Sequence, residues 1–326
     1  MSADDEVRLE ALAGLLEAAR RNDDPDAFPI TTRKLGNDIR YGHDLEPPVL
    51  YALEPDRPGE PVAMMNVDIP ERDNRHLIWA DLTVHPECRG RGYGSQLVDA
   101  LVEMARDLGR TTLWAGAPED ATWDGFLTRR GFTSASGDAR RHQVLAEVDW
   151  AEIARLEAEA AERSADYTLQ RLTPPYDDTL LKELIEVTAA INDAPMGSLD
   201  FEEEVFDLER VRNGETAWQR RGDTVFRVVA RHRSTDEIGG HTWLVHDPEQ
   251  PTLGHQADTA VSRTHRGHRL GLACKIEMLR WLAEAAPRIE VIETWNNVDN
   301  LFMIDVNEAM GYRLSRSFAT YQRVLA

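Results

Sequence analysis

A glycine-rich turn with two arginines occupies residues 89–94 and reads Arg-Gly-Arg-Gly-Tyr-Gly. The pattern of apolar residues predicts a strand before it and an amphipathic helix after it. Glycines let the backbone approach an anion closely, and the free N–H groups at a helix N-terminus favour a phosphate group. A tight packing turn would use the same residue types. The turn therefore predicts, on its own only weakly, a pyrophosphate site made of Arg89, Gly90, Arg91, Gly92, Tyr93 and Gly94.

The same pattern recurs 177 residues later. Asp81 and Val84 of the preceding strand are repeated as Asp258 and Val261, and a Gly-aromatic pair follows each copy, at Gly131-Phe132 and Gly311-Tyr312. A repeat indicates a doubled fold and favours a ligand site over a packing turn. The second candidate loop consists of Arg266, Gly267, His268, Arg269, Leu270 and Gly271.

The elements that must position these turns follow one order in both halves: a meander of strands, a helix, a buried strand, a short helix and a closing strand. In the first half, we expect strands at 49–53, 61–69, 77–84, 111–114 and 143–148, and helices from the glycine turn to Gly109 and at 121–130. In the second half, we expect strands at 167–172, 225–230, 241–245, 257–261, 291–295 and 317–324, and helices at 177–191, 201–220, 270–285 and 300–310. A connecting helix at 150–163 separates two expected domains, 1–165 and 166–326.

Arg89, Gly92 and Gly94 match the Arg/Gln-x-x-Gly-x-Gly/Ala signature of the GCN5-related N-acetyltransferases (GNATs), which each half of the chain resembles. In the second copy Arg266 and Gly271 match, but Arg269 stands at the middle glycine. The doubling resembles the tandem acetyltransferases of actinobacteria, among them the mycothiol synthases. The resemblance implies an α/β (α+β) fold of two tandem GNAT-type domains, each a mixed, mostly antiparallel twisted sheet flanked by helices.

The resemblance also implies that acetyl-CoA, as co-substrate, lies between two splayed strands. Backbone N–H groups of the strand before each loop would hold the thioester oxygen and stabilise the charge that develops when an amine attacks. Those residues are Leu82, Thr83 and Val84 in the first copy, and Thr259, Ala260 and Val261 in the second. Many relatives hold the cofactor with an Asn eleven residues before the Gly-aromatic pair. Only the second copy has it, as Asn300, so the resemblance places catalysis mainly in the C-terminal domain, with the N-terminal domain binding coenzyme or serving as a scaffold.

Two carboxylates are candidates for the general base of the second copy, Asp258 and Glu293. Because Asp81 repeats Asp258, this aspartate could instead satisfy backbone amides, and Glu293 is preferred. The tyrosine that serves many relatives as an acid is missing, and Asn307 stands at its place. Asn307 could hydrogen-bond the sulfur or the substrate, or it could be a capping or core-facing amide.

Composition excludes several classes of partner. A net charge of −21 argues against nucleic acid and anionic membranes, and it suits a cationic acceptor, although a solvated acidic surface is the preferred explanation of the charge. Cys88 and Cys274 form no disulfide framework, and no His or Cys spacing suggests a metal. The chain has no stretch of about 20 apolar residues, and its first six residues are acidic rather than signal-like, so we expect a cytoplasmic protein.

Taken with the resemblance, these observations predict an enzyme that acetylates a primary amine of a small molecule. Three alternatives stay open: catalysis in the N-terminal domain, a non-catalytic acyl-CoA sensor or interaction module, and a donor other than acetyl-CoA. The identity of the acceptor and the oligomeric state are not indicated by the sequence.

Overall fold

The computed structural model describes residues 6–325, so the acidic segment 1–5 and Ala326 lie outside the described part. The chain forms two compact units, neither of which is continuous in sequence. Unit 1 comprises Met1–Gly137, Gly197–Glu203 and Phe318–Ala326, and unit 2 comprises Asp138–Met196 and Glu204–Ser317. The expected boundary near residue 165 stays a prediction.

Unit 1 is built on a mixed sheet with one parallel pair. Its strands lie in the order β1 (Val49–Leu53), β2 (Ala63–Asp68), β3 (Leu77–Val84), β4 (Thr112–Pro118) and the end of β11 (Arg313–Val324). β3 and β4 are parallel, and the other neighbours are antiparallel. The chain's last strand thus completes the sheet of its first unit.

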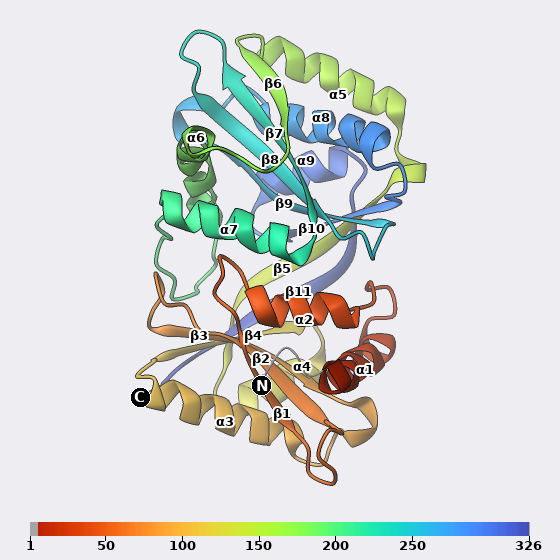
Figure 1. The fold of residues 1–326 in the computed structure, drawn as a ribbon, viewed down its shortest axis with the longest axis vertical. Coiled ribbons are helices and arrows are strands. Elements are labelled where there is room, and N and C mark those ends of the chain that lie inside the picture. The colour runs from red at the N-terminus through yellow and green to blue at the C-terminus, as the bar shows by residue number, and fades with distance from the viewer. Residues whose placement is uncertain (1–5, 326) are drawn as a thin grey trace. The chain divides into compact units, whose positions relative to one another are not determined.

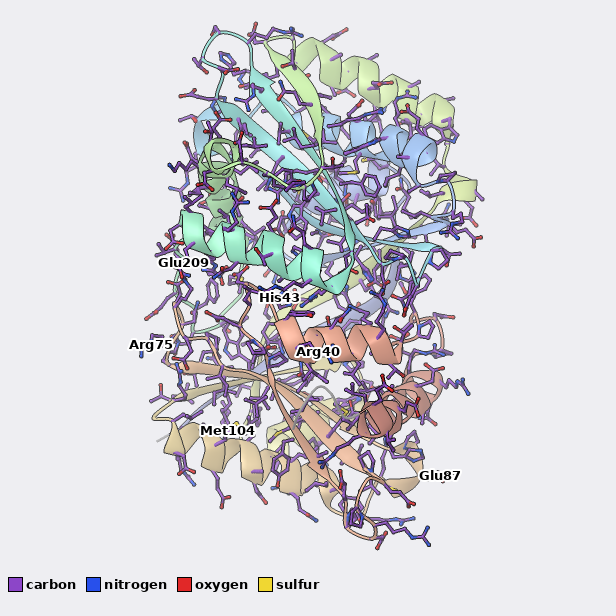
Figure 2. All side chains as sticks on the ribbon, in the orientation of Figure 1. Arg40, His43, Arg75, Glu87, Met104 and Glu209 are labelled. Atoms are coloured by element: carbon purple, nitrogen blue, oxygen red, sulfur yellow. The ribbon has the colours of Figure 1, made fainter. Side chains whose placement is uncertain are left out.

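Helices cover both faces of this sheet (Figure 1). Alternation along β2 turns Met65 toward α3 (Tyr93–Asp107) and Met64 toward α1 (Glu6–Asp23) and α2 (Thr32–Tyr41). Figure 2 labels Met104 on α3 and Arg40 on α2, one on each of these helical layers. The short helix α4 (Ala121–Arg129) follows β4.

Unit 2 has a longer sheet of the same design. Its strands lie in the order β6 (Tyr167–Leu172), β7 (Thr224–His232), β8 (Ile238–His246), β9 (Leu253–Val261), β10 (Val291–Asn297) and the end of β5 (Thr133–Val144). Again a single pair, β9 with β10, is parallel among these neighbours. Residues 138–144 of β5 complete this sheet at β10.

Two helical layers flank the sheet of unit 2 (Figure 1). Phe226, Val228 and Leu244 pack on the side of α8 (Leu270–Ala285) and α5 (Trp150–Arg163). Val229 and Ile238 pack on the side of α6 (Asp178–Ala189) and α7 (Leu208–Arg221). Helix α9 (Leu301–Ala309) follows β10, and 3-10 turns lie at Pro86–Cys88, Leu145–Glu147, Ala190–Asp193 and Arg263–His265.

The predicted fold class is confirmed, and strands 49–53, 77–84 and 167–172 and helices 150–163 and 270–285 have the predicted bounds. Two predictions were wrong. The helix expected at 201–220 begins only at Leu208, where the Asp207 side chain caps it. The strand expected at 143–148 runs from Thr133 to Val144, because pairing rather than apolar alternation defines it.

Within residues 6–325, no helix has both the length and the apolar character needed to cross a membrane. The same residues contain no group of three His, Cys, Asp or Glu side chains arranged to hold a metal ion.

Candidate active site

In each unit the two parallel strands pair over four residues and then separate. The last pairs are Ala80 with Ala115 in unit 1, and Gln256 with Thr294 in unit 2. Beyond these pairs, the edges of β3 and β9 that face the parallel neighbour are open between the strands. Asp81 is the first residue of β3 beyond the last pair, and Asp258 is the second residue of β9 beyond it, so the repeated aspartate lies within the opening in both units.

The loop of unit 1 holds the conformation that its glycines were expected to provide. Gly90 and Gly92 have φ of 75° and 89°, a region that residues with a Cβ rarely adopt. A Cβ on Gly94 would lie 3.2 Å from the ring of Phe126, so this glycine allows close packing of the helix start. The first hydrogen bond of α3 runs from the Gln96 N–H to the Gly92 carbonyl. The amides just before Gln96 therefore have no acceptor within the helix and are available to an anion.

The loop of unit 2 follows the same backbone course, but a residue with a Cβ, Arg269, occupies one of its left-handed positions. Gly267 has φ of 85°, and Arg269 holds a left-handed φ of 54° at the position of Gly92. The first hydrogen bond of α8 runs from the Ala273 N–H to the Arg269 carbonyl, which leaves the amides of Leu270 and Gly271 available in the same way. Both loops therefore retain the geometry of a phosphate cradle.

A pocket opens at each loop, of about 460 Å³ in unit 1 and about 320 Å³ in unit 2. In unit 1 the predicted residues on its wall are Leu82, Val84, Arg89, Gly90, Gly92, Tyr93 and Gly94, joined by Trp123 and Phe126 of α4. In unit 2 they are Thr259, Ala260, Val261, Arg266, Gly267, Arg269, Leu270, Gly271 and Asn300, joined by the segment 190–195.

Three predicted loop or strand residues do not line these pockets. Arg91 donates to the Glu87 carbonyl at 3.0 Å, and the Nδ1 of His268 lies 3.2 Å from the Arg163 carbonyl. Thr83 lies on the face of β3 opposite Leu82 and Val84. The side chains of Arg91 and His268 thus contact backbone carbonyls instead of lining the pockets.

Acidic partners of the loop arginines were missed by the sequence analysis. Arg89 donates to Asp23 at 2.7 Å and to the Val84 carbonyl at 3.2 Å. In unit 2 Arg266 binds Asp193 and the Val261 carbonyl in the same way. Hydrogen bonds from Arg263, and then from Arg266, lower the pKa of Asp193 to about 2. Comparing the two halves further upstream for an acidic residue could have found this pair.

Asn300 lines the pocket of unit 2, and its side chain has a structural task as well. Its Oδ1 accepts the Met303 N–H at 3.3 Å and caps α9. At the corresponding place in unit 1, Asp120 caps α4 by accepting the amides of Thr122 and Trp123. Asn300 and Asp120 therefore cap corresponding helices, and the two copies differ here in having an amide or a carboxylate as the capping side chain.

Asp258 sits at a β-bulge, where Trp243 of β8 faces both Ala257 and Asp258 of β9. Desolvation by the surrounding protein raises the pKa of Asp258, and a hydrogen bond from Trp243 and the charge of Arg227 oppose this rise. Asp258 as a residue is half-buried. A carboxylate with a raised pKa is suited to take a proton near neutral pH.

Asp81 has a similar setting in unit 1. Asp81 is exposed as a residue, but the protein around its carboxyl group desolvates it and raises its pKa to about 6. The hydrogen bond that it accepts from the Trp79 indole is long, at 3.4 Å. The alternative role for the repeated aspartate was to accept hydrogen bonds from backbone amides. Among the described residues, Asp81 accepts no such bond.

Glu293 lies in a row of charged side chains on β5, β10 and β9 rather than on the pocket wall. Its carboxylate is 3.0 Å from His142, 3.4 Å from His255 and 3.7 Å from Arg140. Burial favours the neutral acid, but hydrogen bonds from the two histidines and the charges of His255 and Arg140 lower the pKa of Glu293 well below its usual range. Such a carboxylate is a weak base.

Asn307 is fully buried in α9 and does not line the pocket. Its Nδ2 donates to the Asn296 Oδ1 at 2.7 Å, while its own Oδ1 is buried without a hydrogen-bond partner among the described residues. The core-facing interpretation of this amide therefore fits its surroundings.

Two units with the same strand order, the same separation of parallel strands and the same loop define a tandem GNAT fold. Residues 11–132 match the family model described as the acetyltransferase (GNAT) family. The predicted resemblance to tandem GNAT proteins is confirmed, while the likeness to mycothiol synthases stays a prediction. A search of curated proteins found no match.

Solved structures extend the likeness over the whole chain. A tandem GNAT protein from the clavulanic acid biosynthesis pathway is 22% identical with a TM-score of 0.79, over 99% of this chain and 97% of its own. A GCN5-related N-acetyltransferase from Sphaerobacter thermophilus is 16% identical with a TM-score of 0.67, over 96% and 91%. A glucosamine N-acetyltransferase region of a fungal multi-domain β-N-acetylglucosaminidase is 15% identical with a TM-score of 0.69, over 98% of this chain and 37% of that one. These identities show a shared fold.

Proposed function

We propose that this chain transfers the acetyl group of acetyl-CoA to a primary amine of a small molecule, mainly in unit 2. One observation carries the proposal: in both units an aspartate of raised pKa stands where two parallel strands separate, directly before a loop that suits a pyrophosphate. The GNAT match and the tandem GNAT fold support acyl transfer in general.

The residues of unit 2 fit coenzyme A. Its pyrophosphate would be held by the amides of Leu270 and Gly271, while Arg266, which is ion-paired to Asp193, lies at the pocket rim. The open edge of β9 from Thr259 to Val261 would hold the pantetheine arm and the thioester. Acetyl-CoA supplies the activated acetyl group.

Asp258 is the proposed general base of unit 2. An ammonium ion cannot attack a carbonyl carbon until it loses a proton, and the carboxylate of raised pKa on this half-buried residue can accept that proton. Glu293, the base preferred from the sequence, is held in ion pairs that lower its pKa, so we propose a structural role for it.

Unit 1 is a second candidate for the catalytic site because of Asp81. This carboxylate has a pKa raised to about 6, close to neutrality, and the loop beside it has glycine at each of the two left-handed positions. Unit 1 would then do the chemistry, and unit 2 would bind coenzyme.

The test is release of CoA thiol from acetyl-CoA with a panel of primary amines, in Asp258→Asn, Asp81→Asn and the control Asp305→Asn, which changes an exposed carboxylate of α9. Loss of a general base lowers kcat by about 10²- to 10⁴-fold. We expect this loss in Asp258→Asn and not in the control. The same loss in Asp81→Asn alone would move catalysis to unit 1, and full activity of both variants would refute the proposed base.

Calorimetry with CoA separates an enzyme from a sensor. Binding of CoA without thiol release for every amine would favour the non-catalytic alternative. The absence of binding in both units would contradict the proposed cofactor.

A further inference from the structure

Arg227 of β7 makes no direct ion pair among the described residues, although the charges of Asp258 and Glu215 act on it from nearby. Among the described residues, its Nη1 donates to the His241 Nδ1 at 3.0 Å, and its Nε has no hydrogen-bond partner. The guanidinium carbon lies 5.4 Å from the Trp243 ring centre and 5.8 Å from that of Tyr176. Desolvation lowers the pKa of Arg227, and Tyr176, Asp258 and Glu215 offset only part of this effect. A charge placed in this way calls for an anion.

The partner of Arg227 cannot supply that anion. His241 is fully buried, and burial, followed by the charge of Arg227, holds its pKa well below the ordinary value. Because an arginine N–H donates to Nδ1, that nitrogen carries no proton, and the ring is neutral. His241 therefore orients the guanidinium without balancing its charge.

Arg227 and Asp258 lie on the same face of the unit 2 sheet. Arg227 is directly opposite Trp243 in the β7–β8 register, and the Trp243 side chain hydrogen-bonds to Asp258. The Trp218 ring of α7 packs on Trp243 with centroids 5.7 Å apart, so this face is the one turned toward α6 and α7. Arg227, Trp243 and Asp258 each keep accessible surface.

The phosphate loop lies on the opposite face. A Cβ on Gly271 of α8 would be 3.4 Å from Thr259 and 3.9 Å from Val261, residues that line the coenzyme pocket. A donor that enters from the α8 side would thus meet, between the separated strands, an acceptor that enters from the α7 side. On that side β7 and β9 are two strand spacings, about 10 Å, apart. A short molecule with one charge at each end can bridge this distance, since the arginine side chain covers part of it.

We propose that Arg227 binds a carboxylate of the acceptor while the acceptor's amine faces Asp258, so that the substrate of unit 2 is an amino acid. This inference rests on the proposed function. In the reaction the amine nitrogen bonds to the acetyl carbon and the carbon–sulfur bond breaks. The ammonium gives up two protons, of which one goes through Asp258 to solvent and one neutralises the CoA thiolate. The products are an N-acetyl amino acid, CoA thiol and one proton.

The experiment compares pairs of acceptors that differ by the carboxylate. L-Alanine, L-lysine and L-phenylalanine are each assayed beside the amine that lacks the carboxylate, namely ethylamine, 1,5-diaminopentane and 2-phenylethylamine. The protein variants are Arg227→Met, Arg227→Lys and Arg231→Met. Arg231 lies on the same strand but is ion-paired to Glu183 at 2.7 Å, which makes it the matched control.

Wild-type protein should prefer at least one amino acid over its paired amine. Arg227→Met should lower kcat/KM for that amino acid by about tenfold to a hundredfold, as expected for loss of a charged hydrogen-bonded pair, and should leave the paired amine within about twofold. For the same amino acid, the kcat/KM of Arg227→Lys should lie between those of the wild type and Arg227→Met. The kcat/KM of Arg231→Met should match that of the wild type. A role of Arg227 in tuning Asp258 alone would lower both members of a pair equally in folded Arg227→Met and would overturn the inference. Equal wild-type use of both members would overturn it as well.

If no amine is acetylated, the proposed function fails, and calorimetry with the same amino acids decides the inference by itself. Binding that Arg227→Met weakens at least tenfold would support the carboxylate site. Binding that the substitution leaves unchanged, or no binding at all, would refute it.

Discussion

The guanidinium of Arg269 lies 2.6 Å from the Glu159 carboxylate, while the Arg269 backbone adopts the left-handed conformation that Gly92 adopts in unit 1. The ion pair links the start of α8 to α5 within unit 2. Both side chains are more than a third exposed, so the pair contributes about 0–1 kcal/mol. The second copy therefore keeps the course of the loop without the glycine that favours it.

We expect substitutions of Arg269 to separate backbone strain from loss of charge. Arg269→Asn removes the ion pair but tolerates a positive φ, whereas Arg269→Ile places a β-branched residue there and should cost about 1–2 kcal/mol more. Thermal unfolding of the two variants measures the difference. Equal stabilities would show that the left-handed conformation is not retained in solution.

Gly94→Leu should close the pocket of unit 1. Its Cβ would lie 3.2 Å from Phe126, a residue of the pocket wall, and the longer side chain must displace that ring. We expect calorimetry to show one fewer CoA bound per chain than in the wild type. The control is Gly14→Leu, where no atom lies within 4 Å of the added Cβ. Unchanged stoichiometry in Gly94→Leu would mean that unit 1 does not bind CoA at this loop.

Asp81 makes the folded state less stable when it is ionised. The folded pKa of Asp81, about 6, is above the unfolded value of about 3.9. The contribution of protonated Asp81 to the free energy of unfolding is therefore complete below pH 3.9 and is lost as the pH rises through 6. Asp81→Asn should therefore stabilise the protein at pH 7.5 by up to about 1 kcal/mol, a figure reduced because the residue is exposed. Urea unfolding at pH 7.5 and at pH 3.9 tests this. A gain of the same size at both pH values would contradict the raised pKa.

Glu293 should behave in the opposite way. Its lowered pKa means that the ionised form stabilises the folded state above the unfolded pKa of about 4.3, and that this contribution fades as the pH falls below 4.3. Glu293→Gln should cost about 2 kcal/mol at pH 7 and less at pH 3, by urea unfolding. The control Glu308→Gln alters a carboxylate that is 58% exposed and 3.7 Å from Arg141, and it should cost under about 0.5 kcal/mol. A cost for Glu293→Gln that did not change with pH would point to packing.

The sequence predicts the loops and the strands around them because their signals are local. Glycines at fixed offsets and short apolar runs specify the turn after β3 and the turn after β9 without help from the rest of the chain. The start of β5 is different: Thr133 to Asp138 is rich in Ser, Gly and Asp, and its strand conformation depends on tertiary contacts. The helices α1 and α2 were not predicted, since they lie before the first of the repeated elements.

The candidate site shows the same limit. Glu293 looks like a base in the sequence because it stands alone on its strand face, yet His142 and His255 reach it from two other strands. Arg227 gives no sequence signal at all, since nothing near it in the chain reveals that its hydrogen-bond partner is the buried, neutral His241.

Each half of the chain supplies the closing strand of the sheet that the other half builds, so neither half has a complete sheet without the other. Residues 318–324 pair with β4 in unit 1, and residues 138–144 pair with β10 in unit 2. A chain cut after residue 165 would deprive the first piece of the strand that covers β4 and the second piece of the strand that covers β10. Each fragment would carry a bare strand edge that invites aggregation. A protease cut in the connecting helix should therefore leave the two pieces held together, whereas genes encoding each half separately should yield active protein only when expressed together.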